Sequence, residues 1–177
     1  MSEETTRRQL VAVALAGYPE EIGHWLWALE DSRQRTLRAL TALPAAAVDY
    51  STPCIDNTIG TLLYHIAAIE ADWLFSEVLQ EEFSPEIARL FPYDVRDERG
   101  RLSVVHGVDL ATHLDRLAQV RATLLAAFRS ISPEDFDRVR ALPAYDVTPA
   151  WVIHHLCQHE AEHRGQILEA RRLAESP

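Results

Sequence analysis

Apolar side chains recur at helical spacing in four long segments of this 177-residue chain, while the alternation typical of strands is nearly absent. Each segment has one apolar and one polar face, so each needs a packing partner. Pro19 and Pro149 suit the first turn of a helix, and Asp56 or Asn57 is expected to cap the second segment. We expect helices at residues 19–40, 58–80, 109–130 and 149–173.

One long connection, residues 81–107, separates the second and third expected helices. A short helix is expected within it at residues 85–90, and Arg99-Gly100 reads as a turn. Connections of this length in a compact domain are often functional. Four amphipathic helices with a long crossover between helices 2 and 3 predict an all-α four-helix bundle, in a single domain spanning residues 1–177.

Composition narrows the classes of partner. The chain is 47% hydrophobic and 25% charged, as ordinary globular proteins are, and its formal net charge is −10. That charge argues against nucleic acid or an anionic membrane surface as a partner. No run of 18 apolar residues predicts a membrane-spanning helix. With only Cys54 and Cys157, no disulfide framework is implied, and a cytoplasmic location is expected.

The most informative stretch for chemistry is HHLCQHEAEHRGQIL, residues 154–168. His155, His159 and His163 recur every four residues, so their side chains lie on one side of a helix. His159 and His163 fall on its apolar face, and His65 falls on an apolar face of the second expected helix. Imidazoles facing a bundle interior need a partner for their lone pairs, and a divalent metal is the simplest one.

Two histidines from one helix and one from another can converge on a single ion. Zinc held by three protein ligands keeps an open coordination position for water or substrate, which is the catalytic pattern. The sequence therefore predicts a metal site of His65, His159 and His163, with zinc as the expected ion and nickel as the alternative.

The stretch TIGTLLYHIA at residues 58–67, followed far downstream by His159-x-x-x-His163-Arg-Gly-Gln166, resembles the DinB-like, or YfiT-like, proteins. The resemblance covers nearly the whole chain in helix order. It implies an up-up-down-down type of four-helix bundle, often dimeric, with one divalent metal on His65, His159 and His163. The family usually has histidine just before the last ligand, where this chain has Glu162.

The resemblance also implies a class of reaction. Characterised relatives include thiol-dependent transferases and isomerases that use bacillithiol, mycothiol or glutathione. The expectation is therefore a homodimer that transfers a low-molecular-weight thiol to a small electrophilic substrate. A metal can deprotonate a bound thiol at neutral pH, but hydrolysis would need the same three ligands. A non-enzymatic dimeric bundle with a structural metal is the third possibility.

Two other metal motifs fit parts of the chain. His159-Glu160-Ala161-Glu162-His163 matches the H-E-x-x-H of zinc proteases, in which the glutamate activates water, although the chain lacks the residues of the longer signature after His163. Glu160 is thus a candidate base, although it lies about 100° around the helix from His159. Glu-x-x-His motifs also suggest a ferritin-like di-iron site, but the third expected helix has no glutamate.

Several further residues keep open roles at this stage. His155 could be a metal ligand, a hydrogen-bonding neighbour of the ligands or a core residue. Asp72 could orient an imidazole or lie in solvent, and His113 has no assigned partner. The four tryptophans, Trp25, Trp27, Trp73 and Trp151, are interpreted as core or dimer contacts rather than a substrate cage.

Overall fold

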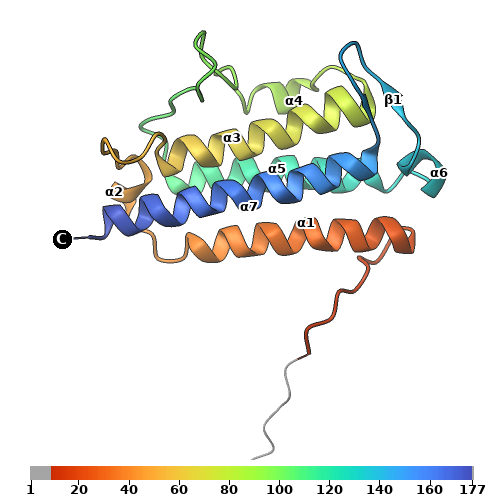
Figure 1. Ribbon diagram of the computed structural model, residues 1–177, viewed down its shortest axis with the longest axis horizontal. Helices are drawn as coiled ribbons and strands as arrows, with labels where there is room; N and C mark the ends of the chain where they lie inside the picture. Colours follow the sequence, from red (N-terminus) through yellow and green to blue (C-terminus); the bar gives the residue numbers. More distant parts are fainter. Residues whose placement is uncertain (1–8, 177) are drawn as a thin grey trace, which may run out of the picture.

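Four long helices lie side by side along the molecule (Figure 1), in a computed structural model that describes residues 9–176. The second of them, α3, continues into a π-helical segment, η1. The expected all-α four-helix bundle is confirmed. Residues 1–8 and 177 of the expected single domain lie outside the described residues. The bounds are α1 Glu20–Ala39, α3 Ile59–Asp72, η1 Trp73–Leu79, α5 Leu110–Phe128 and α7 Pro149–Ala174.

The helix directions differ from the up-up-down-down arrangement implied by the resemblance. In Figure 1, α1 and α7 run one way while α3 and α5 run the other way. Contacts agree, since Ser32 and Ala39 of α1 meet Arg164 and Arg171 further along α7. An up-up-down-down bundle needs two long crossovers. This chain has one, between the parallel helices α3 and α5, so the order is up-down-down-up.

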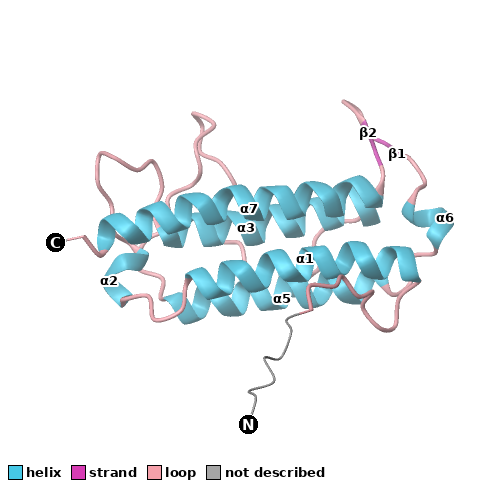
Figure 2. Ribbon diagram, turned by 60° about the horizontal axis from the view of Figure 1, so that its bottom comes forward, coloured by secondary structure: helices cyan, strands magenta, loops and turns pink. Residues whose placement is uncertain are grey.

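Short elements that periodicity does not reveal lie in the connections between the long helices. A pattern needs about two turns to show, and each of these elements has two to four residues. Of the short helices, only α4 was expected, at residues 85–90. Figure 2 shows α2 at one end of the bundle and α6 with the hairpin at the other. These elements are α2 Ala45–Val48, α4 Pro85–Ala88, α6 Pro133–Phe136, and the antiparallel strands β1 Arg140–Ala141 and β2 Asp146–Val147.

Side-chain oxygens cap three of the four long helices, and α1 begins after Pro19 without such a cap. The cap of α3 is Thr58, whose side chain accepts a hydrogen bond from the Thr61 amide, and neither Asp56 nor Asn57 fills this role. Asp109 caps α5 and Thr148 caps α7 in the same way. Each cap satisfies an amide that the helix itself leaves unpaired.

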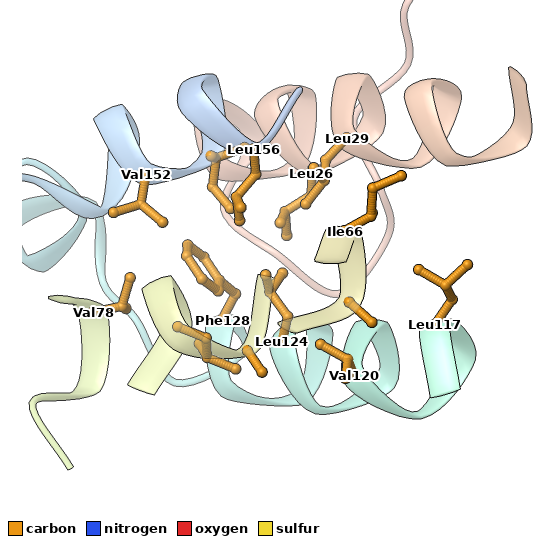
Figure 3. Close-up of a cluster of buried hydrophobic side chains, with 14 of the residues drawn as sticks. Leu26, Leu29, Ile66, Val78, Leu117, Val120, Leu124, Phe128, Val152 and Leu156 are labelled. Carbon is orange, nitrogen blue, oxygen red and sulfur yellow. The ribbon is translucent and has the colours of Figure 1, made fainter. Parts of the chain in front are cut away.

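The apolar faces meet in one continuous core (Figure 3). Leu26 and Leu29 of α1 are fully buried, as are Leu124 and Phe128 of α5. Burial of such side chains is the main driving force for assembling the bundle. No helix in the described range is both long and apolar enough to cross a membrane.

A cluster of buried charges interrupts this core, with one residue from each long helix. Glu70 accepts hydrogen bonds from Arg33 and from Arg121, at 2.8 Å and 2.7 Å. Glu160 accepts from Arg33 at 2.8 Å and from Arg121 at 3.3 Å. We call Arg33, Glu70, Arg121 and Glu160 the buried charge cluster. Two carboxylates and two guanidinium groups balance in charge, and their directional bonds join all four helices at one level of the bundle.

Polar contacts hold the crossover against α3 and α5. The Tyr64 hydroxyl donates to the Tyr93 carbonyl at 2.6 Å, and Arg116 donates to the Leu90 carbonyl at 2.9 Å. The amide of Val105 donates to the Thr61 hydroxyl. The crossover is thus fixed beside the first half of α3, the half that carries His65.

Candidate metal centre

The structure brings His65 of α3 together with His159 and His163 of α7. The Nε2 atom of His159 lies 3.1 Å from Nε2 of His65 and 3.0 Å from Nε2 of His163. A tetrahedral zinc ion with bonds of about 2.05 Å holds its nitrogen ligands about 3.3 Å apart. All three ligand atoms lie within 4.8 Å of one another. The three histidines could therefore hold a metal ion.

Burial keeps two of these rings neutral. It lowers the pKa of His65 to about 4, with a smaller contribution from His163. It lowers the pKa of His159 to about 3, and His163 and His65 add to the effect. Arg96, from the crossover, contributes to both shifts. A neutral imidazole has a free lone pair, so both rings are ready to bind a cation at pH 7.

A second contact orients His163. Its Nδ1 lies 2.9 Å from the side-chain oxygen of Gln166, one turn further along α7. The amide oxygen can only accept, so Nδ1 carries the proton and Nε2 keeps its lone pair. Histidine ligands of metals are commonly held by such an outer hydrogen bond.

Glu160 does not join the histidines. It is 1% exposed, and both its carboxylate oxygens bond to arginines of the buried charge cluster. The step of about 100° around α7 turns it from the metal site into the bundle core. The candidate role of Glu160 as a base, and with it the zinc-protease interpretation, has no support from this geometry. Arg33 and Arg121 also neutralise the carboxylates of Glu70 and Glu160. In a di-iron site metal ions would take the place of these arginines, so this geometry does not support that interpretation either.

The three residues with open roles fall in different places. His155 packs against both Trp73 and Trp151, with its ring centroid 5.8 Å from that of His159. Asp72 contacts Ser76 rather than an imidazole, and burial raises its pKa. His113 is fully buried beside Arg116, away from the other histidines.

Two hollows with volumes of about 400 and 460 Å³ include Asp56 and Asn57, just before α3. The first reaches Gln166, the residue that holds His163. The second includes Arg96 and Arg101 and is the more basic of the two. Neither hollow is lined by the three histidines, but the first lies beside Gln166, and an anionic group in the second would meet arginine. Sequence reasoning missed Arg96 because a loop arginine has no periodic pattern that places it.

A four-helix bundle with three histidines converging from two of its helices defines a class of proteins with a potential metal centre. A family model described as the DinB superfamily matches residues 28–167, and the chain belongs to this superfamily.

Solved structures agree on the fold. A conserved protein from Enterococcus faecalis superposes with a TM-score of 0.64 at 19% identity, covering 82% of this chain and 92% of its own. A protein from Streptococcus pneumoniae gives 0.61 at 14% identity, covering 84% and 89%. No curated protein matches this chain. The expected homodimer and cytoplasmic location stay predictions.

His113 gives a test of pH dependence that does not involve the metal ligands. Burial, followed by the charge of Arg116, lowers its pKa from 6.5 to about 4. The unfolded chain therefore takes up a proton at a higher pH than the folded chain does. The stability from the neutral ring is complete above pH 6.5 and is lost as the pH falls towards 4, by up to about 3 kcal/mol.

Urea unfolding of chelator-treated protein at several pH values measures this effect. The loss of unfolding free energy between pH 7 and 4.5 should be smaller in His113→Gln than in the unchanged protein. His106→Gln is the control, because His106 is exposed and lies 3.6 Å from Asp49 in the same region. An unchanged pH profile in His113→Gln would contradict the assignment.

Proposed function

We propose that this protein binds one divalent ion, zinc or alternatively nickel, through His65, His159 and His163, and uses it to activate a small nucleophile. The observation that supports this most strongly is the convergence of three imidazole nitrogens, two of them 3.0 and 3.1 Å from the third. Three protein ligands leave one coordination position free. The hollow beside Gln166 gives a small molecule room close to this position.

The proposed nucleophile is a low-molecular-weight thiol, and the proposed reaction is its transfer to an electrophilic small molecule. When bound, the ion would lower the pKa of a thiol or of water and so supply a nucleophile at neutral pH. The protein residues do the rest. The buried His65 and the partly buried His159 stay neutral, Gln166 fixes the ring of His163, and Arg96 attracts an anionic thiol or substrate.

A thiol-conjugation assay tests this function. Zinc-loaded protein is mixed with glutathione, bacillithiol or mycothiol and a chromogenic electrophile such as 1-chloro-2,4-dinitrobenzene. We expect the arylated thiol to form at least about tenfold faster than in buffer, a difference of about 1.4 kcal/mol in barrier. A chelator should abolish the increase, and added zinc should restore it.

Two outcomes would reject the transferase. Substrate loss that needs metal but no thiol would indicate a hydrolase. No metal-dependent reaction with any thiol, in protein that holds a full equivalent of zinc, would favour a structural ion. His155→Ala is the matched control, because it lies one turn from His159 on the same helix face and is outside the proposed ligand set.

A further inference from the structure

A separate cavity of about 480 Å³ lies at the end of the bundle where η1, the β hairpin and the start of α7 come together. Figure 1 shows this end beside β1 and α6. The cavity lies outside the metal centre and is lined by Trp73, Val139, Tyr145, Asp146, Val147, Thr148 and Trp151.

Aromatic rings form much of its wall. The ring of Trp73 lies 5.2 Å from that of Trp151 and 6.2 Å from that of Tyr145. Trp151 and Tyr145 are each 46% exposed, so neither belongs to the core. Trp73 is partly buried and packs against the core, as expected, whereas the exposed Trp151 does not belong to it. Contact of either ring with a second subunit stays a prediction. Their rings are available to a ligand.

Negative charge gathers at the same place without a compensating cation. Asp146 lines the cavity, and the Tyr145 hydroxyl donates to Oε1 of Glu77 at 2.8 Å. Glu77 is 7% exposed, and its Oε2 has no hydrogen-bond partner in the described part of the chain. Asp72 lies one turn before Ser76 and also interacts with Glu77 through its charge.

The available cations are engaged elsewhere. The chain contains no lysine. Arg138 and Arg140 of the neighbouring hairpin both bond to Asp135. Among residues 9–176, no salt bridge involves Asp72, Glu77 or Asp146.

We infer that this cavity binds a small organic cation of the alkylammonium class. Trp73, Trp151 and Tyr145 offer the π faces that attract such a group, and tryptophan is the strongest of these partners. Asp146 supplies the opposite charge in the wall, and Glu77 adds to it from behind Tyr145. A neutral apolar ligand would fill the cavity but would remove water from the Asp146 carboxylate without replacing its interactions. A cation would contact the aromatic rings and would also pair with the negative charge.

Burial raises the pKa of Glu77, and the hydrogen bond with Glu77 raises the pKa of Tyr145 to about 12. Burial thus disfavours the charged form of Glu77, and a cation bound nearby would favour it again.

The cavity is connected to the metal centre by stacked rings. Trp151 stacks on His155 with centroids 5.1 Å apart, and the centroid of His155 is 5.8 Å from that of His159. Trp151 and His159 are eight residues apart on α7, a rise of about 12 Å. A substrate held by its ammonium group in the cavity could therefore extend towards the metal. This step, unlike the binding itself, rests on the proposed function.

Calorimetric titration with choline and with 3,3-dimethylbutan-1-ol tests the inference, because the alcohol has the same shape but carries no charge. We expect choline to bind at least tenfold more tightly. Glu77→Gln, which keeps a partner for Tyr145, should remove most of that preference. Trp151→Leu should weaken binding of choline by at least tenfold. Trp25→Leu, at a partly exposed tryptophan of α1, should bind as the unchanged protein does.

Equal affinity for choline and the alcohol would overturn the inference in favour of a plain apolar cavity. Absence of binding by choline at about 10 mM would also overturn it, since a millimolar site is then mostly filled. His159→Ala without metal should still bind choline. This variant separates the cavity from the proposed thiol transfer. The thiol reaction can fail while choline still binds, and choline can fail to bind while the thiol reaction proceeds.

Discussion

Replacement of His159 by alanine is expected to lower the bound metal from about one ion per chain to less than about a tenth of that. Nε2 of His159 lies between the other two, 3.1 Å from that of His65 and 3.0 Å from that of His163. Its loss leaves two ligands on different helices, which cannot enclose the ion. Elemental analysis of untagged protein by mass spectrometry gives the result, and avoiding a histidine tag avoids loading the wrong ion.

The neighbouring residues provide matched variants. His163→Ala should also lose the ion, whereas His155→Ala should retain it because the ring of His155 packs against Trp73 and Trp151. Thermal unfolding provides a second measurement, since an ion that binds only the folded chain raises its stability. A chelator should lower the melting temperature of the unchanged protein and have no effect on His159→Ala. Full metal content in both His159→Ala and His163→Ala would refute the site.

The four long helices were predictable because each carries an apolar stripe several turns long. The order of their directions was not, and the up-up-down-down expectation was wrong. The direction of each helix depends on whether the connection before it stays at one end of the bundle or runs back along its length. The connections containing α2 and α6 stay at the two ends, so only residues between η1 and α5 return along the bundle. Such short elements leave too little pattern in the sequence.

For side chains too, the sequence pattern predicts which face of a helix a residue lies on, but not which residue of another helix it contacts. His159 and His163 stand four residues apart on an apolar face, so sequence alone predicts that they point inward together. Glu160 is beside them in sequence, yet it faces Arg33 and Arg121 from other helices. Pairing between distant helices is invisible in a single helix pattern. Glu160 was therefore considered for the metal site, and its place in the buried charge cluster was missed.

Glu70→Gln is expected to lower the free energy of unfolding by about 3–5 kcal/mol. The Glu70 carboxylate accepts one hydrogen bond from Arg33 and two from Arg121, and all three residues are nearly inaccessible to solvent. Burial alone would raise its pKa, but Arg121 and Arg33 lower it below the ordinary value. Without this charge, Glu160 is the only fully buried carboxylate left for the two guanidinium groups, and Arg121 keeps only the partly exposed Glu30 besides. Urea unfolding at pH 7 measures the loss.

An exposed pair provides the control for Glu70→Gln. Asp31→Asn removes the partner of Arg35 on the outer face of α1, where an ion pair contributes about 1 kcal/mol or less. A loss of similar size in Glu70→Gln would show that the buried charges are solvated after all.

Replacing the whole cluster separates the value of the charges from the cost of leaving one unpaired. The variant Arg33→Met, Glu70→Leu, Arg121→Met and Glu160→Leu should be more stable than Glu70→Gln, because it leaves no charge unpaired in the core. If it unfolds more readily than Glu70→Gln, the cluster itself stabilises the bundle. If it is also at least as stable as the unchanged protein, the ion pairs contribute less to stability than to fixing the level at which the four helices meet.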